Sequence, residues 1–461
     1  MFSPSREAKL AESARIERVQ LAQTGSASYV RTRLGLYRWA ALKLRLLPFP
    51  ALLVLIAWVT FATPYTTHYD GPPIRSDGVG YHAWTRALLS GDYSFCQWRG
   101  AIENFVSSYD KQRKFCQNKY PPGLALLRLP VMAFLVDSTG DSRRIGASEH
   151  LASLVIGGAF LGLQCWLLFR VAALLRLRFW RSAAAITLTL VGTGLLHYAT
   201  YDSAFTHAYS AFFCSVLVYL GVREYATARP MPVALLALAA FFILALRMTN
   251  VFLLAIITLA YVVWRPLKDA RALWRSLASV TFGAALAIGL QLAYNYLANG
   301  TLSPNSYGEE GFVWDRPMQR SVLFSYERGL FTYFPLFGVA ILSGCYVRAT
   351  RKLSLLLVGV VAAYTALYGF WHSWMLGDGM GHRGFVELGP IVAVVLCCAW
   401  QRLHGKQLAV ALCAGTLATA VTLQLMLGYW DTSYPTLGAT REDYWQQLRK
   451  LPSPWSHEPN G

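Results

Sequence analysis

Repeated apolar blocks constrain the fold of this chain more than any other feature of its sequence. The blocks run for roughly 17–22 residues, the length that crosses a hydrocarbon core of about 30 Å. Because a chain in lipid must satisfy its own backbone hydrogen bonds, these blocks are predicted to be helices. Only 14% of the 461 residues are charged and 55% are hydrophobic, unlike a soluble domain of this size. The predicted fold class is an all-α multi-pass integral membrane protein.

The blocks predict about eleven transmembrane helices, of which the fifth and sixth are short enough to form a hairpin instead. The predicted organisation is a basic cytoplasmic segment at 1–47, a transmembrane domain at 48–430 and an extracytoplasmic tail at 431–461. Residues 1–30 and 445–461 are expected to be mobile. The expected helices lie at 48–66, 150–172, 182–199, 207–222, 231–246, 251–264, 277–297, 331–347, 354–371, 385–400 and 407–429.

Lysine and arginine residues in the short connections set the expected orientation of the helices. With the spans above, the basic connections and the N-terminal segment fall on one side, which is predicted to be the cytoplasm. The opposite connections around 198–206 and 299–330 are neutral or slightly acidic. We therefore expect a protein of the inner (cytoplasmic) membrane. The basic connections contain Arg176, Arg178, Arg181, Arg223, Arg229, Arg265, Lys268, Arg271, Arg275, Arg348, Arg351, Lys352, Arg402 and Lys406.

The net charge of +18 is compatible with nucleic acid, anionic lipid or phosphate-bearing ligands. In a membrane protein the position of the charges decides among these partners. We expect membrane lipids as partners, and no nucleic acid. Because residues 1–47 are polar and lack a long apolar run, the first span is expected to be the targeting signal.

A long loop at 67–149 follows the first span on the predicted outer side. It contains ten lysine and arginine residues, and we expect juxtamembrane helices within it. Cys96 and Cys116 share this loop, and the sequence leaves open whether they form a disulfide. Two later outer stretches, 298–330 and 371–384, are rich in tyrosine, tryptophan, glycine and charged residues.

The start of the long loop places a carboxylate at a predicted helix end. Ser76 or Asp77 suits an N-cap, and residues 79–89 can form a helix that ends at Ser90-Gly91. Asp77 would then lie at the positive end of that helix, which favours its ionised form. Such a carboxylate can accept a proton from a hydroxyl nucleophile. The alternative, that Asp77 only caps the helix, is favoured by the local sequence alone.

Other polar residues each have a functional and a structural interpretation. The turn at 120–123 starts an apolar run in which Arg128 is expected to snorkel or pair. Arg247 suits bidentate contact with a phosphate or a snorkelling anchor. A divalent metal is possible at one outer connection, although no strong metal signature is present. The residues crowded there are His197, Tyr201, Asp202 and His207.

The two late outer stretches add candidates for substrate binding. Arg328 precedes Gly329, and His382 and Arg383 lie in a glycine-rich run. Glycine lets the backbone approach a ligand closely, arginine suits phosphate, and clustered aromatic faces suit sugar rings. The alternative for the aromatic residues is a belt at the membrane interface.

This order of features resembles the membrane glycosyltransferases of the GT-C fold. A basic N-terminus and one span lead to an outer loop with an early aspartate, a Tyr-Pro-Pro-Gly turn and many further spans. The most similar group is the bacterial polyprenyl-phosphate-sugar-dependent transferases related to protein O-mannosyltransferases and the aminoarabinose transferase. The resemblance covers roughly residues 45–400 and rests on short motifs.

The resemblance implies roles for individual residues. Asp77 matches the catalytic base or acceptor-orienting carboxylate, and Asp70 is a second candidate. Many relatives carry an Asp-Glu pair here, whereas Gly78 follows Asp77, which weakens the case for a paired-carboxylate or metal site. Arg328 and Arg383 match positions near the lipid phosphate. The residues predicted to bind substrate are Asp70, Arg75, Tyr81, His82, Tyr120, Arg247, Arg328, His382 and Arg383.

The predicted function is transfer of a hexosyl or pentosyl group from a polyprenyl-phosphate donor to an extracytoplasmic hydroxyl on a glycan, lipid or protein. Asp77 would deprotonate the hydroxyl, arginines would neutralise the leaving phosphate, and direct displacement would invert the anomeric centre. The main alternative is a transporter or flippase for a lipid-linked or anionic substrate. An O-antigen ligase or polymerase and a non-catalytic assembly subunit are further alternatives.

Overall fold

The described part of the chain is mostly helical in a computed structural model of the protein. The structure describes residues 73–98, 106–110, 115–136, 145–264, 270–308, 310–435 and 437–450. The predicted segment 1–47, the first predicted span at 48–66 and Asp70 lie outside these residues. All described residues belong to one compact unit.

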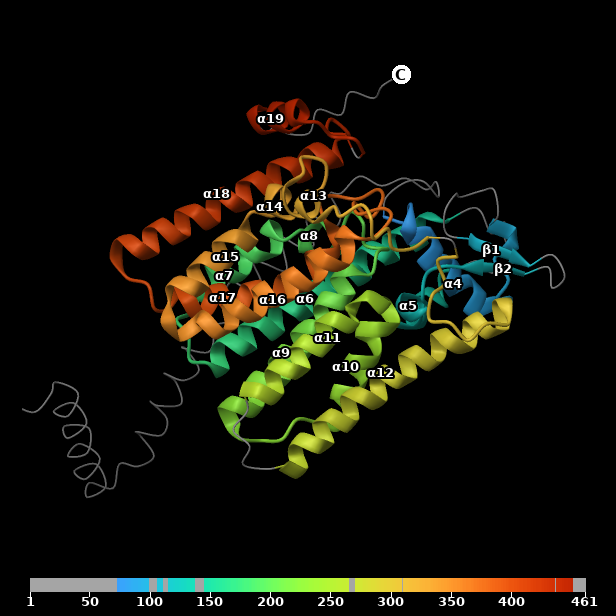
Figure 1. Ribbon diagram of the computed structural model, residues 1–461, viewed down its shortest axis with the longest axis horizontal. Helices are drawn as coiled ribbons and strands as arrows, with labels where there is room; N and C mark the ends of the chain where they lie inside the picture. Colours follow the sequence, from blue (N-terminus) through green and yellow to red (C-terminus); the bar gives the residue numbers. More distant parts are fainter. Residues whose placement is uncertain are drawn as a thin grey trace, which may run out of the picture. The chain divides into compact units, whose positions relative to one another are not determined.

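The elements follow one another along the chain with two short strands among many helices (Figure 1). In order they are α4 (Asp77–Ser90), η1 (Cys96–Trp98), β1 (Val106–Asp110), β2 (Phe115–Asn118), α5 (Gly123–Met132), α6 (Ala147–Leu174), α7 (Phe179–Gly192), α8 (Leu195–Ala199), α9 (His207–Thr227), α10 (Val233–Leu246), η2 (Met248–Asn250), α11 (Val251–Trp264), α12 (Ala270–Asn299), α13 (Gln319–Phe324), α14 (Leu330–Tyr333), α15 (Leu336–Tyr346), η3 (Arg348–Thr350), α16 (Arg351–Gly369), η4 (Arg383–Leu388), α17 (Gly389–Trp400), α18 (Gly405–Trp430) and α19 (Arg441–Arg449).

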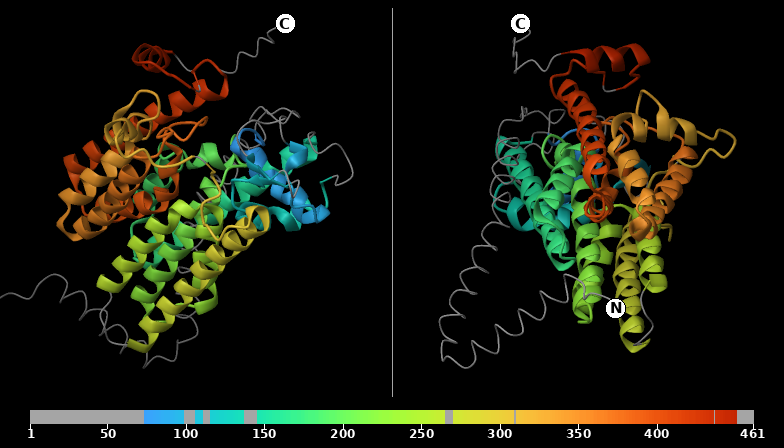
Figure 2. Two further views of the ribbon diagram at one scale, coloured as in Figure 1. Left: turned by 45° about the vertical axis from the view of Figure 1, so that its right-hand side comes forward. Right: turned by 90° about the vertical axis from the view of Figure 1, so that its left-hand side faces the viewer.

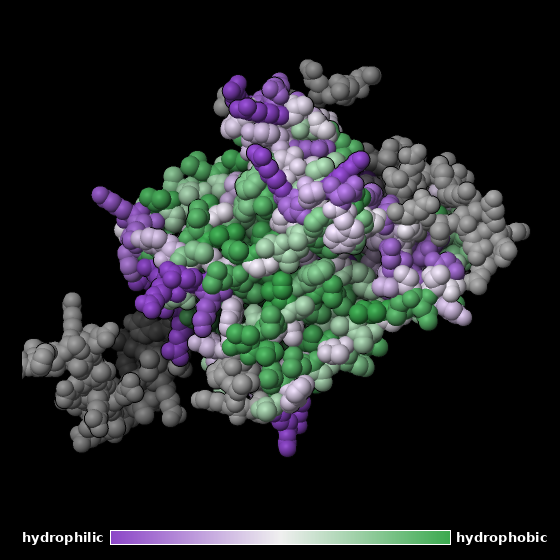
Figure 3. Space-filling view, in the orientation of Figure 1, coloured by the Kyte–Doolittle hydropathy of each residue, from purple (hydrophilic) through white to green (hydrophobic). Residues whose placement is uncertain are grey.

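Long apolar helices make this a helical membrane protein. Among the described residues, five helices are long and apolar enough to cross a membrane by length and composition, and α5, α10, η2 with α11, and α15 are shorter apolar helices. Figure 3 shows hydrophobic residues across the middle of this face and hydrophilic residues gathered toward its edges. Each predicted span from 150–172 onward meets a helix or a pair of helices, while the count of about eleven stays a prediction.

Three predicted spans are broken near one another rather than continuous. The span expected at 182–199 is divided at Gly194, whose φ of 76° is left-handed, and the span at 331–347 is divided before Pro335. The span at 385–400 begins with the 3-10 turns of η4. A Cβ added to Gly194 would lie 2.8 Å from the ring of Phe334, so two of these breaks pack directly together. The break at η4 lies beside the first loop, since Arg383 at its start contacts Asp77.

Helices α9 and α17 contact each other and several further helices, and α4, α5, β1 and β2 of the first loop lie together at one side of the helices (Figures 1 and 2). Helix α9 contacts α6, α10 and α17, and α10 also contacts α12. Helix α5 reaches α10 closely, since a Cβ on Gly123 would lie 2.2 Å from the carbonyl oxygen of Ala245. Only glycine at position 123 of the Tyr-Pro-Pro-Gly turn allows this close approach of the first loop to α10.

The first loop contains a hairpin that the sequence did not predict. Strands β1 and β2 pair antiparallel, and a disulfide joins Cys96 to Cys116 across a separation of 20 residues. The all-α prediction holds for the helices but missed these two strands. The strands are short and mostly polar, so they carry little of the apolar alternation that identifies a strand.

The structure differs from two further expectations, one for Arg128 and one for the C-terminal residues. Arg128 neither snorkels nor pairs: it is fully buried, and none of its guanidinium nitrogens has a hydrogen bond within the described residues. Residues 445–449, expected to be mobile, belong to α19, where Tyr444 donates to the carbonyl of Thr332 at 3.1 Å. Tertiary contacts of this short helix, which its sequence does not reveal, order it.

Candidate active site

Asp77 lies at the start of a helix, as the sequence predicted, but α4 begins at Asp77 itself rather than near residue 79, and Asp77 does not cap it. Ser76 holds the N-cap position with a φ of 47°, and no side-chain capping bond forms. The Asp77 carboxylate turns instead toward Arg383, whose Nη2 donates to Oδ2 at 2.5 Å. The Asp77 side chain is 22% exposed and that of Arg383 only 7%. Asp77 thus presents one oxygen to a buried cation and keeps Oδ1 without a hydrogen bond from any described residue.

Gly78 explains the absence of a second carboxylate beside Asp77. A Cβ at this position would lie 2.8 Å from the Cβ of Ala204, a separation that real side chains do not tolerate. The Asp-Glu pair carried by many members of the resembled family could not be accommodated without shifting α4 away from the 202–206 turn. The site is therefore built around one carboxylate at this point.

A loop at 374–382 holds the Arg383 guanidinium with backbone carbonyls. Nη1 of Arg383 donates to the carbonyl of Asp378 at 3.0 Å, and Nη2 donates to that of Leu376. The hydroxyl of Tyr198 fixes the same loop by donating to Met380 O at 2.9 Å. Left-handed backbone turns these carbonyls inward. The residues with positive φ are Leu376, Gly377, Gly379 and Gly381.

Arg75, predicted to bind substrate, is occupied by ion pairs that tie this loop to the rest of the site. Its Nε and Nη2 form a fork with the Asp202 carboxylate at 2.9 and 3.2 Å, and its Nη1 donates to Asp378 Oδ2 at 2.8 Å. Arg328 lies 3.9 Å from the other oxygen of Asp378 and is also buried. The Arg75 side chain is therefore a positioning group for the loop that holds Arg383.

His197 orients the carboxylate of Asp202 through a hydrogen bond. Its Nδ1 accepts a hydrogen bond from the indole N–H of Trp430 at 2.8 Å, and an indole nitrogen can only donate. Nε2 is therefore the donor toward Asp202 Oδ2, at 2.9 Å. Burial alone would raise the pKa of Asp202, but Arg75 and His197 together hold it well below its usual value. Asp202 is ionised, and both of its oxygens accept hydrogen bonds from Arg75 or His197.

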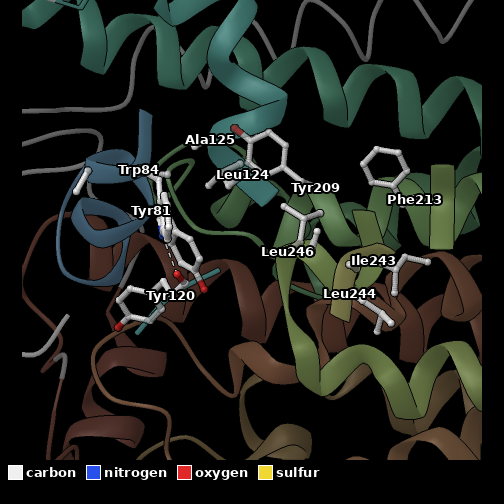
Figure 4. Close-up of a cluster of buried hydrophobic side chains, with 14 of the residues drawn as sticks. Tyr81, Trp84, Tyr120, Leu124, Ala125, Tyr209, Phe213, Ile243, Leu244 and Leu246 are labelled. Carbon is white, nitrogen blue, oxygen red and sulfur yellow. Dashed lines mark hydrogen bonds between the residues drawn. The ribbon is translucent and has the colours of Figure 1, made fainter. Parts of the chain in front are cut away.

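Tyr81 and Tyr120 form the aromatic side of the site (Figure 4). Their ring centroids lie 4.7 Å apart, and the indole of Trp84 donates to the carbonyl of Tyr120 at 2.7 Å. Burial raises the pKa of Tyr81 to about 12; Arg247 opposes the shift and Asp77 adds to it. Tyr81 therefore keeps its proton at neutral pH and can donate a hydrogen bond to a ligand beside Asp77.

Arg247 is paired rather than snorkelling. Its Nη1 donates to Glu387 Oε1 at 2.9 Å, and His207 Nδ1 lies at the same distance from that oxygen. The charge of Arg247 opposes the rise in the pKa of Tyr81, so the two side chains interact electrostatically. Only 14% of the Arg247 side chain is exposed, so a ligand could contact it only over a small part of its surface.

The two histidines predicted to bind substrate are engaged elsewhere. His82 Nε2 lies 3.3 Å from Glu149, which also receives the guanidinium of Arg86, in a fully buried cluster. His382 Nε2 donates to the carbonyl of Trp374 at 3.0 Å, which fixes the loop around Arg383. Their predicted role in binding substrate remains untested, and the contacts observed are structural.

Three arginines act electrostatically on His382. Burial is the main cause that lowers the pKa of His382 to about 3, and Arg247, Arg328 and Arg383 all act in the same direction. The structure thus brings together cations that are separated by as many as 136 positions in the sequence. This neighbourhood can accept an anion such as a phosphate.

Acidification should destabilise the fold through the buried histidines His82 and His382. The pKa of each is lowered, mainly by burial, so below about pH 6.5 the unfolded chain binds more protons than the folded chain. For His382 alone, the free energy of unfolding should fall by about 1 kcal/mol from pH 7 to pH 5.5. Thermal unfolding in detergent across this range should show a smaller pH dependence for His382→Gln than for the unaltered chain; equal slopes would contradict the assignment.

The possible metal site is divided by the fold. His197 and Asp202 face each other, whereas His207 faces Glu387. Within the described residues, no group of three or more histidine, cysteine, aspartate or glutamate side chains is placed to hold a metal ion.

Several residues of the site were not chosen from the sequence. Glu387 lies inside an apolar span, and an ionisable residue there is by default a candidate functional residue. Asp378 lies in the glycine-rich stretch that was singled out, but nothing marked it above its neighbours. Tyr429 and Trp430 end the last long helix and gave no signal, since aromatic residues are common at helix ends near a membrane.

Comparison with known proteins adds a likeness of fold. No protein-family model matches the chain, and no curated protein matches its sequence. Among solved structures it is similar to ArnT from Cupriavidus metallidurans bound to undecaprenyl phosphate, with a TM-score of 0.50 and 14% identity. The match covers 84% of this chain and 65% of that one, so this chain spans slightly less than two thirds of the ArnT chain. The likeness confirms, for the fold, the resemblance seen in the sequence: the chain has a GT-C-like membrane fold.

Proposed function

We propose that this protein is a membrane glycosyltransferase of the cell envelope. It moves a hexosyl or pentosyl group from a polyprenyl-phosphate donor to an acceptor hydroxyl outside the inner membrane. Residues 1–47 lie in the cytoplasm, 48–430 form the transmembrane domain, and 431–461 form an extracytoplasmic tail. The GT-C-like fold and the undecaprenyl phosphate bound by ArnT support this proposal.

The observation that carries the proposal is the contact between Asp77 and Arg383 at 2.5 Å. In a direct displacement, the attacking hydroxyl and the leaving phosphate lie on opposite sides of one carbon atom. The base and the cation that holds the phosphate must therefore lie within one site, on either side of the same sugar, and the contact puts Asp77 and Arg383 in one site. Asp77 retains an open oxygen, and Arg383 retains its Nε–H, which makes no hydrogen bond to a described residue.

The chemistry follows from these two groups. The acceptor oxygen forms a bond to the anomeric carbon as the bond from that carbon to the phosphate oxygen breaks. The hydroxyl proton passes to Asp77, and the electron pair leaves with the polyprenyl phosphate. Arg383, with Arg247 and Arg328 nearby, stabilises the charge that develops on the phosphate. Attack opposite the leaving group inverts the anomeric centre.

The direct test supplies the full chain, reconstituted in liposomes, with synthetic tritiated undecaprenyl-phosphate sugars and an extract of the host envelope. The proposal expects label to leave the lipid fraction and enter an acceptor, with release of undecaprenyl phosphate. Consumption of no donor from a panel of hexosyl and pentosyl lipids would refute it. Transport of unchanged donor across the liposome bilayer would instead favour the flippase alternative.

A further inference from the structure

A chain of aromatic ring contacts leads from the candidate active site to the protein surface. Tyr120, whose ring is tilted against that of Tyr81, lies 6.4 Å from Tyr307 by ring centroids. Tyr307 lies 5.5 Å from Trp371, and Trp371 lies 5.3 Å from Phe312. These contacts join the first loop to both late outer stretches, so the path is continuous although its residues are far apart in sequence.

The outer end of this path is a platform built by two paired segments. Phe312 forms an antiparallel bridge with Trp371, and Val313 N donates to Phe370 O at 2.7 Å. Because side chains two residues apart in an extended segment point to the same face, Phe312 and Trp314 lie together, with centroids 5.4 Å apart and planes inclined by 23°. Phe312 is 43% exposed and Trp314 69%.

Charged side chains line the inner part of the path. Lys119 Nζ donates to Glu310 at 2.7 Å and lies 5.6 Å from the ring centre of Tyr307. The His372 ring lies 3.4 Å from the other oxygen of Glu310. Aromatic faces therefore alternate with groups that can donate or accept hydrogen bonds, which is the combination that a sugar ring requires of a binding surface.

We propose that this aromatic platform, defined as Tyr307, Phe312, Trp314 and Trp371, binds a carbohydrate acceptor and leads its hydroxyl to Asp77. The inference rests on the proposed function and deepens it by naming a glycan as the acceptor. The C–H faces of the sugar rings stack on the exposed rings, and their hydroxyls reach Lys119 and Glu310.

Two features favour a glycan over the donor lipid tail or the bilayer as the occupant. A polyprenyl tail binds apolar surface, whereas the ion pair between Lys119 and Glu310 lines this path. Trp314 is followed directly by exposed Asp315 and Arg316, which keep the platform in water. A tryptophan that anchors the protein in the bilayer interface would have a lipid-facing apolar neighbourhood instead.

The first experiment measures binding without transfer. The detergent-solubilised full chain, carrying a fluorescent label, is applied to an array of bacterial surface oligosaccharides. Trp314→Ala should weaken binding about five- to tenfold, the value of one stacking contact. Trp180→Ala is the matched control, because Trp180 is also 69% exposed but lies at the start of α7, away from the platform. Equal binding by the two variants would overturn the proposal.

The second experiment separates the platform from the transfer reaction. With tritiated donor lipid alone, Trp314→Ala should release sugar to water at the same slow rate as the unaltered chain. With an array-selected oligosaccharide as acceptor, its KM should rise about five- to tenfold while kcat changes little. Label recovered on a protease-sensitive product would overturn the glycan acceptor. If no donor is consumed by any chain, the proposed function fails, whereas oligosaccharide binding still tests the platform.

Discussion

Replacing Asp77 by asparagine should reduce sugar transfer by roughly 10²- to 10⁴-fold, the contribution of a positioned general base. The amide is nearly isosteric, so α4 and its neighbours should keep their positions, while the group that accepts the hydroxyl proton is lost. Donor binding should change little, because the phosphate is held by arginines. The loss should therefore lie in kcat, with the donor KM close to that of the unaltered chain.

The measurement is the initial rate of label transfer from tritiated donor lipid in liposomes, normalised to the amount of folded protein. Glu442→Gln is the matched control, since Glu442 is an exposed carboxylate on the same predicted outer side and lies in the first turn of α19, outside the site. A normal rate for Asp77→Asn at normal expression would remove Asp77 from catalysis and leave it as a partner of Arg383 alone.

Much of the fold was predictable because lipid imposes a simple rule on composition. Residues 251–264 were predicted as a span and form α11 with the same bounds, since an apolar run in this setting has no alternative to a helix. The start of α4 was predictable from local helix-start signals. The interruption at Gly194 was not, because it depends on the ring of Phe334, which comes from a span far along the chain.

The site was predictable in its members but not in their pairing. Asp77 and Arg383 were both chosen, yet 306 positions separate them, and no local pattern reports such a contact. Helix geometry could have sharpened one choice. Residues four apart share a helix face, so Tyr81 accompanies Asp77, whereas His82 points toward Glu149. The occupation of Arg75 by Asp202 and Asp378 required the tertiary structure, because all three residues looked equally available.

Arg383→Lys should lower transfer by roughly 10²-fold even though it preserves the positive charge. The guanidinium donates to two backbone carbonyls and Asp77 at once from a rigid plane, and its Nε–H, which no described residue accepts, can still donate to phosphate. An ammonium group has three donors on a flexible stem and cannot reproduce this arrangement. Arg320→Lys on α13 is the control, since Arg320 is exposed and lies outside the site. The rate is measured with the same donor lipid.

The double variant Asp77→Asn/Arg383→Lys shows whether the two residues act together. If Arg383 acts partly by orienting Asp77, that part of its effect disappears once the carboxylate has been replaced. The double variant should then be slower than Asp77→Asn, but by less than the full loss that Arg383→Lys causes in the unaltered chain. Fully multiplied losses would mean that Arg383 acts only on the leaving phosphate, independently of Asp77. The 2.5 Å contact would then be a resting arrangement, which the donor phosphate breaks when it binds.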